Sequence, residues 1–353
     1  CGSNQLTSLD VSLNTALTYL NVERMSMASL DVSNNIALTQ LYCSKNQITS
    51  LDVSNNTALT ELIIHDNQLT SLDVSKNTAL TYLHCYNNQL TSLDVSKNTV
   101  LNELWCSDNE FTSLDVSKNT ALTVLDIGGS SFTNLDVSNN TALTYLGIMG
   151  TQLTSLDVTN NTALTYLNIN NNQLTSLDVS KNTALTKLHC QENQLTSVDV
   201  SKNTDLKYLK LNDNQLTSVD VSQNTGLINL YLNANQLTTV DVSKNTSLND
   251  FQCQDNKLTS LDVSSNTALN WLSFYNNSLI YLNMRNGITN PTYFNVTGNS
   301  LSCIETLDPT WATANWTSTN VSSIDGTTNI DAGVTFSIIC GATAVTTWHV
   351  ATT

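Results

Sequence analysis

The sequence predicts an all-β-rich solenoid built from coils of 21 residues, and two observations predict it. The first is an apolar-Asp-Val triplet, Leu-Asp-Val at residues 9–11, which recurs thirteen times to residues 261–263 with Val replacing Leu in three copies. A constant period of this length is typical of a solenoid, whose units bury their apolar faces only against their neighbours. The second is an apolar and polar alternation of period two within each unit, which indicates extended segments and little helix.

One unit, residues 80–100 (LTYLHCYNNQLTSLDVSKNTV), shows how each coil is built. Alternation over residues 82–86 turns Leu83 and Cys85 inward and turns the other three side chains outward. The same alternation over residues 92–96 turns Asp94 and the flanking serines outward. We call the first set of outward positions, in all units, the strand face, and the second set the aspartate face. Each coil therefore has extended segments on both of its sides.

Two asparagine positions recur at the bends between these segments. One follows the first segment, at Asn46, Asn67, Asn88, Asn109, Asn172 and onward, and the other occurs in all thirteen units, at Asn98 and its equivalents. A side-chain amide at a bend can satisfy backbone groups that no regular strand pairing reaches. We expect both sets of asparagines to stack from coil to coil as part of the scaffold.

Six of the eight cysteines occupy one inward position, which other units fill with Val22, Ile64, Ile127, Leu211 and Phe274; these cysteines are Cys1, Cys43, Cys85, Cys106, Cys190 and Cys253. Sharing a position with aliphatic residues predicts buried thiols that act as small hydrophobic side chains. A metal ladder is the alternative, but gaps of two to four units leave no clustered ligands. Only Cys85 and Cys106 lie in neighbouring units, and their parallel side chains disfavour a disulfide.

The chain divides into a solenoid over residues 1–290, with about 13–14 repeats, and a degenerate last repeat with a C-terminal cap over residues 291–353. Cys1 is in phase with Cys43, so we expect the N-terminus to be truncated in mid-repeat. The period breaks after Leu282. Cys303 and Cys340 lie beyond the repeats and are predicted to form a disulfide, which favours an oxidising, extracellular setting.

The pattern LxxLxCxxNxLxxLDVSxNTA resembles the 21-residue leucine-rich repeats of bacterial surface proteins, internalin J and secreted Bacteroidetes proteins among them. The resemblance covers roughly the first 280 residues. Residues 300–320 (SLSCIETLDPTWATANWTSTN) are similar to the cap of such secreted proteins, whose cysteine often pairs with one just downstream. The resemblance implies a location outside the cell or on its outer surface and a role in binding other molecules, and it implies no catalytic residues.

The formal net charge is −16, and thirteen of the 29 acidic residues are the repeated aspartates, Asp10 to Asp262, which we call the ladder aspartates. Only 13 lysines and arginines are present, so nucleic acid and anionic membranes are poor partners. No run of eighteen apolar residues exists, so we expect no insertion into a membrane.

The strand face is the variable surface of the solenoid and is predicted to bind a protein or a glycan. Its 39 outward positions carry nine of the eleven tyrosines, two tryptophans and three of the four histidines, over a background of Asn and Gln. Such a composition is typical of recognition surfaces. The alternative is that cross-strand tyrosine stacking only stabilises the sheet. The candidate ligand-binding residues are Glu61, His65, Tyr82, His84, Tyr86, Glu103 and Trp105 in a first group, and Lys187, His189, Tyr208, Lys210 and Tyr231 in a second.

Between these groups the strand face carries small and flexible side chains, Gly128, Gly129, Gly147, Met149 and Gly150. They indicate either a recess or the remnant of an older repeat. His65, His84 and Glu61 could be interpreted as a metal site, but exposed polar contacts are the simpler interpretation. No pairing of a nucleophile with a base is present, and the ladder aspartates are identical copies, so we expect no enzyme.

The ladder aspartates need compensation, since like charges ~4.8 Å apart repel one another. Serine hydroxyls, turn N–H groups and lysines three residues on, such as Lys97, are the simplest source. Calcium bound between coils is the alternative, and no other cofactor is expected. A structural role as a spacer, or self-association through the aspartate face, is the second hypothesis for the whole protein.

Overall fold

The computed structural model describes residues 4, 6–289, 291–316 and 330–341. The chain forms a parallel-strand solenoid of about 14 turns with 21-residue spacing, which confirms the predicted fold class. It divides into two compact units, residues 1–216 and 217–353. The division expected at residue 290 remains a prediction, and Cys1 lies outside the described residues.

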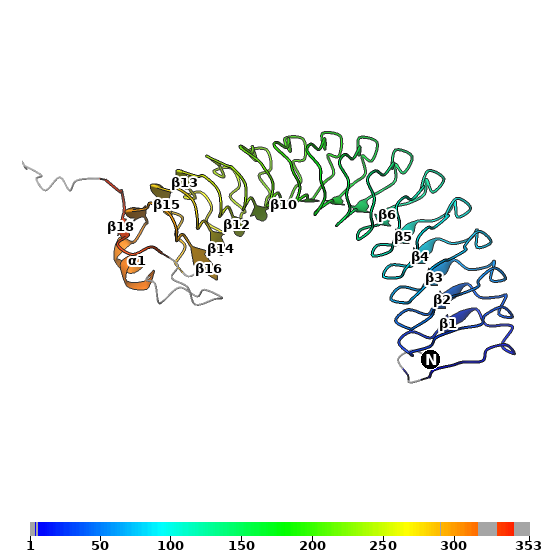
Figure 1. Ribbon diagram of the computed structural model, residues 1–353. Coiled ribbons are helices and arrows are strands. Elements are labelled where there is room, and N and C mark those ends of the chain that lie inside the picture. The colour runs from blue at the N-terminus through cyan, green and yellow to red at the C-terminus, as the bar shows by residue number, and fades with distance from the viewer. Residues whose placement is uncertain (1–3, 5, 290, 317–329, 342–353) are drawn as a thin grey trace, which may run out of the picture. The chain divides into compact units, whose positions relative to one another are not determined.

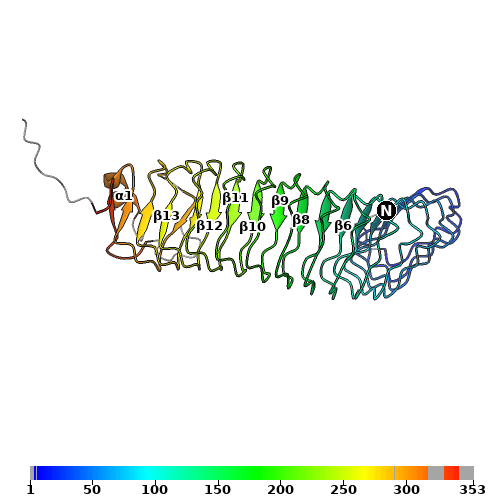
Figure 2. The same ribbon diagram turned by 90° about the horizontal axis from the view of Figure 1, so that it is seen from above.

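The first unit contains ten parallel strands of three residues, which pair in the order of the sequence along one side of the coils (Figure 1). They are β1 (Tyr19–Asn21), β2 (Gln40–Tyr42), β3 (Glu61–Ile63), β4 (Tyr82–His84), β5 (Glu103–Trp105), β6 (Val124–Asp126), β7 (Tyr145–Gly147), β8 (Tyr166–Asn168), β9 (Lys187–His189) and β10 (Tyr208–Lys210). Neighbouring strands are in register at 21 residues, as with Leu83 of β4 and Leu104 of β5. In Figure 2, β8, β9 and β10 lie side by side.

The second unit continues the same construction and adds a second sheet. Strands β11 (Asn229–Tyr231), β12 (Asp250–Gln252), β14 (Trp271–Ser273) and β16 (Tyr293–Asn295) pair in that order. On the other side of the coils lie β13 (Ser260–Asp262), β15 (Tyr281–Asn283), β17 (Cys303–Glu305) and β18 (Thr335–Ser337). The described residues contain one α-helix, α1 (Pro309–Asn315), which begins where Asp308 accepts a hydrogen bond from the backbone N–H of Trp311 at 2.9 Å.

The inward side chains form a continuous apolar core. Leu83, Cys85 and Val95 are fully buried, as are their equivalents along most of the solenoid. Burial raises the pKa of the Cys85 thiol to about 12, so this side chain stays protonated and acts as a small hydrophobic residue. Cys43, Cys85, Cys106, Cys190 and Cys253 are all buried free thiols, which confirms the interpretation for the described members of this column.

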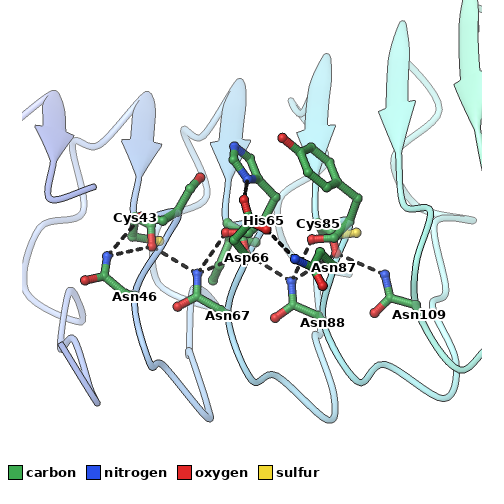
Figure 3. A network of polar contacts seen from close by, with 12 residues as sticks. Cys43, Asn46, His65, Asp66, Asn67, Cys85, Asn87, Asn88 and Asn109 are labelled. Carbon is green, nitrogen blue, oxygen red and sulfur yellow. Dashed lines mark hydrogen bonds and ion pairs between the residues drawn. The ribbon is translucent and has the colours of Figure 1, made fainter. Parts of the chain in front are cut away.

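The corner asparagines bind neighbouring coils together, as predicted (Figure 3). The Nδ2 of Asn88 donates to the carbonyls of Ile64, in the preceding coil, and of Cys85 and Tyr86, in its own coil. Its Oδ1 accepts from the backbone N–H of Leu69 at 3.0 Å. Asn46, Asn67, Asn109 and Asn172 repeat this arrangement, each with three carbonyl acceptors. The second asparagine column does the same from the other bend, where Asn98 donates to the carbonyls of Val74 and Asn77.

The aspartate face is organised by local turns. In all thirteen copies the ladder aspartate accepts a hydrogen bond from the backbone N–H two residues on, as with Asp94 and Ser96 at 2.8 Å. The predicted contribution of the turn N–H groups is thereby confirmed. The charge of Lys97 also lowers the pKa of Asp94, so the expected lysines contribute as well. Regular strand pairing appears on this side only from Ser260 onward.

The ladder aspartates predict a loss of stability in acid. The Ser96 hydroxyl and backbone N–H hold the pKa of Asp94 below its ordinary value of 3.8, and Asp115 and Asp136 are held low by their own turns. A pKa that is lowered in the folded state stabilises the fold above pH 3.8, and this stabilisation disappears as the pH falls through the folded-state pKa. We expect the melting temperature, followed by circular dichroism, to fall steeply below about pH 4.

A triple variant, Asp94→Asn, Asp115→Asn and Asp136→Asn, keeps an acceptor oxygen in three adjacent turns but removes three titrating groups. Its melting temperature should fall less on acidification than that of the unaltered chain. An equal fall in both proteins would exclude the ladder as a source of the acid sensitivity.

The end of the solenoid is closed by the predicted disulfide, which joins Cys303 on β17 to Cys340 with a Cα–Cα distance of 5.8 Å. Beside it, the buried Glu305 carboxylate accepts hydrogen bonds from the Cys340 backbone N–H and the Tyr281 hydroxyl. Arg285 forms an ion pair with the same carboxylate at 3.2 Å. Trp316 is buried against Phe294, Trp311 and Phe336. The aromatic side chains of the cap therefore form part of the core at this end of the solenoid.

Candidate functional site

The first group of candidate residues lies on three adjacent strands or directly after them. The rings of His65 and Tyr86 stack in parallel, with centroids 4.2 Å apart and an interplanar angle of 8°. The Nδ1 of His65 contacts the Asp66 carboxylate at 2.7 Å, and Asn87 donates to the same carboxylate from the next coil (Figure 3). The imidazole is thereby held in one orientation by contacts on two sides.

The two glutamates of the first group are engaged by aromatic and imidazole side chains. Glu61 accepts a hydrogen bond from the hydroxyl of Tyr42. Glu103 accepts one from the indole N–H of Trp105 at 3.4 Å and lies 3.7 Å from the Nε2 of His84. Burial lowers the pKa of His84, although Glu103 opposes this effect, so His84 is neutral at neutral pH. Tyr82 lies between the two glutamates in the strand register.

Four residues of the second group lie in the first unit, and the structure brings these four together; they are Lys187, His189, Tyr208 and Lys210. The ammonium group of Lys187 lies 5.2 Å from the centroid of the Tyr208 ring, a cation–π distance. Tyr208 and Lys210 of β10 pair in register with Lys187 and His189 of β9. Burial, with help from the charges of Lys210 and Lys187, lowers the pKa of His189 to about 4. Tyr231 lies in the second unit, where its hydroxyl donates to Asp250 at 2.6 Å.

Two tyrosines that the sequence interpretation left out of both groups connect them. The rings of Trp105 and Tyr145 lie 5.4 Å apart at 28°, although they stand on β5 and β7 with β6 between them. Tyr145 meets Tyr166 edge-on at 5.1 Å, and Tyr166 meets His189 edge-on at 5.0 Å with a hydrogen bond between its hydroxyl and Nδ1. One aromatic row therefore runs from His84 on β4 to His189 on β9.

The glycines between the groups make room for the side chains of this row. A Cβ on Gly147 would lie 2.5 Å from the Asp126 carboxylate and 2.9 Å from the Tyr145 hydroxyl. A Cβ on Gly128 would lie 2.7 Å from the backbone oxygen of Met149. The alternation of outward positions places Tyr145 and Asp126 on this face, but only the structure shows that they fill the space above Gly147.

Asp126 is the most deeply buried carboxylate of the first unit, at 2 % exposure. The Tyr145 hydroxyl donates to its Oδ2 at 2.9 Å. Burial raises the pKa of Asp126, while hydrogen bonding from Tyr145, Ser107 and the Gly128 backbone opposes the rise. Its Oδ1 is buried and makes no hydrogen bond of regular geometry with any described residue. An incompletely satisfied carboxylate thus lies where the rings of Trp105 and Tyr145 meet.

The strand face is suited to binding another molecule through direct surface contacts. Within the described ranges, no three His, Cys, Asp or Glu side chains stand close enough together to hold a metal ion. On the aspartate face the surface is hollowed between neighbouring coils, as at Ser113, Asp115, Ser117, Asn134 and Asp136. That face is uniform from coil to coil, whereas the strand face differs at each coil.

The fold and this face define a leucine-rich-repeat solenoid, and residues 57–98 match the family model described as leucine rich repeats, in two copies. The functional domain of InlJ from Listeria monocytogenes, which includes a cysteine ladder, is 36 % identical, with a TM-score of 0.80 over 88 % of this chain and 68 % of that one. The chain belongs to the leucine-rich-repeat family that includes InlJ. No protein with a curated description matches it.

Two further solved structures share the fold at lower identity. An internalin, inlF, of Listeria monocytogenes is 22 % identical, with a TM-score of 0.67 over 82 % of this chain and 84 % of that one. The ectodomain of a receptor kinase from Arabidopsis thaliana, in complex with CASPARIAN STRIP INTEGRITY FACTOR 2, is 18 % identical, with a TM-score of 0.59 over 83 % of this chain and 48 % of that one. None of these matches indicates a catalytic family. The described residues contain no helix long and apolar enough to cross a membrane.

Proposed function

We propose that this chain is a non-enzymatic binding and adhesion module, located outside the cell or on its outer surface, whose strand face recognises a protein. The observation that carries the proposal is the aromatic row from His84 to His189, flanked by Glu103 at one end and Lys187 at the other. Aromatic side chains with a polar rim are typical of protein interfaces, and a repeat scaffold holds them at fixed spacing. The disulfide and the internalin relatives support the extracellular location.

The geometry of the rings favours a protein over a glycan. His65 and Tyr86 stack face to face at 8°, and Trp105 and Tyr145 stack at 28°, so ring faces that a sugar would use are turned toward other rings. The edges and polar tips of the side chains remain for contact, and these suit a polar, shaped protein surface. The receptor ectodomain with the same fold is in complex with a factor, which is consistent with this choice.

The same stacks also stabilise the sheet, which is the alternative explanation for the tyrosines. Stacking alone does not account for Asp126, which stands buried and incompletely bonded beneath a row of rings. A purely structural face would be expected to avoid that cost, since burying a carboxylate is unfavourable unless both of its oxygens are paired and hydrogen-bonded.

The test compares the unaltered chain with a triple variant, Tyr82→Ala, Tyr86→Ala and Trp105→Ala. Both proteins are used to capture protein partners, and both are applied to a glycan array. We expect the unaltered chain to retain a protein that the triple variant loses, by a factor of at least about 100 in affinity, because such aromatic anchors carry most of an interface's energy.

A matched control, Thr91→Ala, Ser92→Ala and Ser96→Ala, alters Thr91 and two serines of the aspartate face in the same coil as Tyr82 and Tyr86. It should bind as the unaltered chain does. Retention of every partner by the aromatic variant would refute the strand-face proposal, and concentration-dependent self-association lost only in the control variant would favour the structural role.

A further inference from the structure

We propose that the part of the strand face on β9 and β10 is a docking surface for an acidic, extended segment of the protein partner. The inference rests on the proposed function and deepens it, since it assigns a chemistry to one end of the recognition surface. Lys187 on β9 and Lys210 on β10 provide the positive charge, and the rings of Tyr166 and Tyr208 flank Lys187.

The first argument is the distribution of charge along the strand face of the first unit. The outward positions of the coils that contain β9 and β10 carry these two lysines and no acidic residue. The outward positions of the earlier coils carry no lysine or arginine and four acidic residues, Glu23, Glu61, Glu103 and Asp126. A carboxylate of a partner is therefore attracted to the β9–β10 end of the face and repelled by the other end.

The second argument is that the positive charge is accessible. Lys187 is exposed, and its ammonium group lies 5.5 Å from the centroid of the Tyr166 ring and 5.2 Å from that of the Tyr208 ring. Contacts with ring faces orient an ammonium group and leave its charge in place. In the part of the chain that the structure describes, no carboxylate lies within 4.0 Å of this ammonium group. Lys187 therefore presents an oriented charge at the surface.

The third argument is that the nearby acidic residues do not cancel this charge. The acidic residues closest in sequence, Glu192, Asp205 and Asp213, lie at bends and not on the strands. The ladder aspartates lie on the other side of the coils, about 10 Å away, which exceeds the Debye length of about 8 Å at physiological salt. Burial and the charges of Lys210 and Lys187 together lower the pKa of His189 to about 4, so the field of the two lysines acts on the strand face itself.

The fourth argument is the spacing of the two lysines. Lys187 pairs in register with Tyr208, and His189 pairs with Lys210, so the lysines stand two positions apart on neighbouring strands. Strands ~4.8 Å apart with a rise of ~3.3 Å per residue place the two Cα atoms about 8 Å from each other. Alternate side chains of an extended chain lie on one face about 7 Å apart, and flexible lysines cover the difference. An extended segment with Asp or Glu at every second residue therefore fits this surface.

The test uses a fluorescein-labelled octapeptide of alternating glutamate and glycine, and a counterpart in which glutamine replaces glutamate. Binding to the full chain is followed by fluorescence anisotropy at physiological salt. The glutamate peptide should bind at least about fivefold more tightly than the glutamine peptide, as two exposed ion pairs allow. Replacing Lys187→Gln and Lys210→Gln together should reduce this advantage to less than about twofold. Replacing both lysines with arginine should retain it, since the charge is kept.

The matched control is Lys181→Gln with Lys202→Gln, which removes two lysines from the other side of the coils, where they act on Asp178 and Asp199. It should change the affinity for the glutamate peptide by less than about twofold, because these charges are screened from the strand face. Equal binding of the two peptides by the unaltered chain, or equal weakening by the two glutamine variants, would overturn the proposal.

A sulfated glycan is the competing ligand, and a heparin octasaccharide serves as its probe. Tighter binding of this probe than of the glutamate peptide, lost on replacing Lys187 and Lys210 with glutamine, would overturn the acidic segment in favour of a glycan. If the aromatic triple variant loses its protein partner while the Lys187→Gln and Lys210→Gln variant keeps it, the acidic-segment proposal is wrong and the strand-face function stands. If the aromatic triple variant keeps every partner, the proposed function fails, whichever peptide binds.

Discussion

Replacing Asn88 with alanine is expected to destabilise the first unit by roughly 3–5 kcal/mol, because several buried backbone groups lose their partners at about 1–3 kcal/mol each. The Asn88 side chain donates to three carbonyls and accepts from the backbone N–H of Leu69, so it joins its own coil to the preceding one. Urea unfolding followed by circular dichroism should show the loss as an earlier transition. In an array of repeats the effect should be greatest in the coils next to the substitution.

The control is Gln89→Ala, at the exposed neighbouring position. It should shift the free energy of unfolding by less than about 0.5 kcal/mol, as is usual for surface substitutions. If both variants unfolded like the parent chain, the corner asparagines would not be the main bond between coils. If both unfolded early, the bend as a whole, rather than its amide, would be responsible.

Replacing both Cys303 and Cys340 with serine is expected to cost about 4 kcal/mol in the cap, from the entropy that a closed loop of this length removes from the unfolded chain. The two residues are separated by 37 in sequence, and the bond ties β17 to the chain after β18. Loss of the bond should also loosen the surroundings of Glu305, which accepts the Cys340 backbone N–H. Amide exchange measured over β17 and β18 should become faster.

Cys253→Val is the matched substitution, because it removes a buried free thiol at a position where other units place aliphatic residues. It should cost less than about 1.5 kcal/mol and leave exchange in the cap unchanged. A double-serine variant with the exchange rates of the parent chain would show that Trp316 and Glu305 hold the cap without the disulfide.

The scaffold could be predicted from the sequence because the same pattern of residue types recurs from coil to coil. Inward Leu83, Cys85 and Val95, the corner Asn88 and the turn at Asp94 all follow from the period and from local chemistry. The lysines expected near the ladder aspartates act through their charge, as Lys97 does at Asp94, and the aspartate accepts its hydrogen bond from the backbone N–H two residues on. A nearby donor within the same turn outcompetes a long side chain that must be ordered.

The candidate site was only partly predictable. The alternation placed Tyr145 and Asp126 on the strand face, but the glycines beside them suggested a recess or a remnant. Whether Tyr145 lies flat, points outward or reaches Asp126 depends on side-chain rotation, which periodicity does not determine. The contact between Trp105 and Tyr145 passes over the short side chains of β6, so it links coils that are not neighbours. Such contacts depend on the combination of three coils rather than on one repeat.

The most direct test of the strand-face proposal is site-specific photo-crosslinking. The photoreactive residue benzoylphenylalanine would replace Tyr82 on the strand face in one protein and Ser92 on the aspartate face of the same coil in another. Tyr82 is half-buried and aromatic, so the substitution keeps an aromatic ring at this position, and Ser92 is exposed. The proposal predicts crosslinks to a different protein from position 82 and none from position 92. Crosslinks from position 92 alone, to a second copy of the chain, would contradict it and establish self-assembly through the aspartate face.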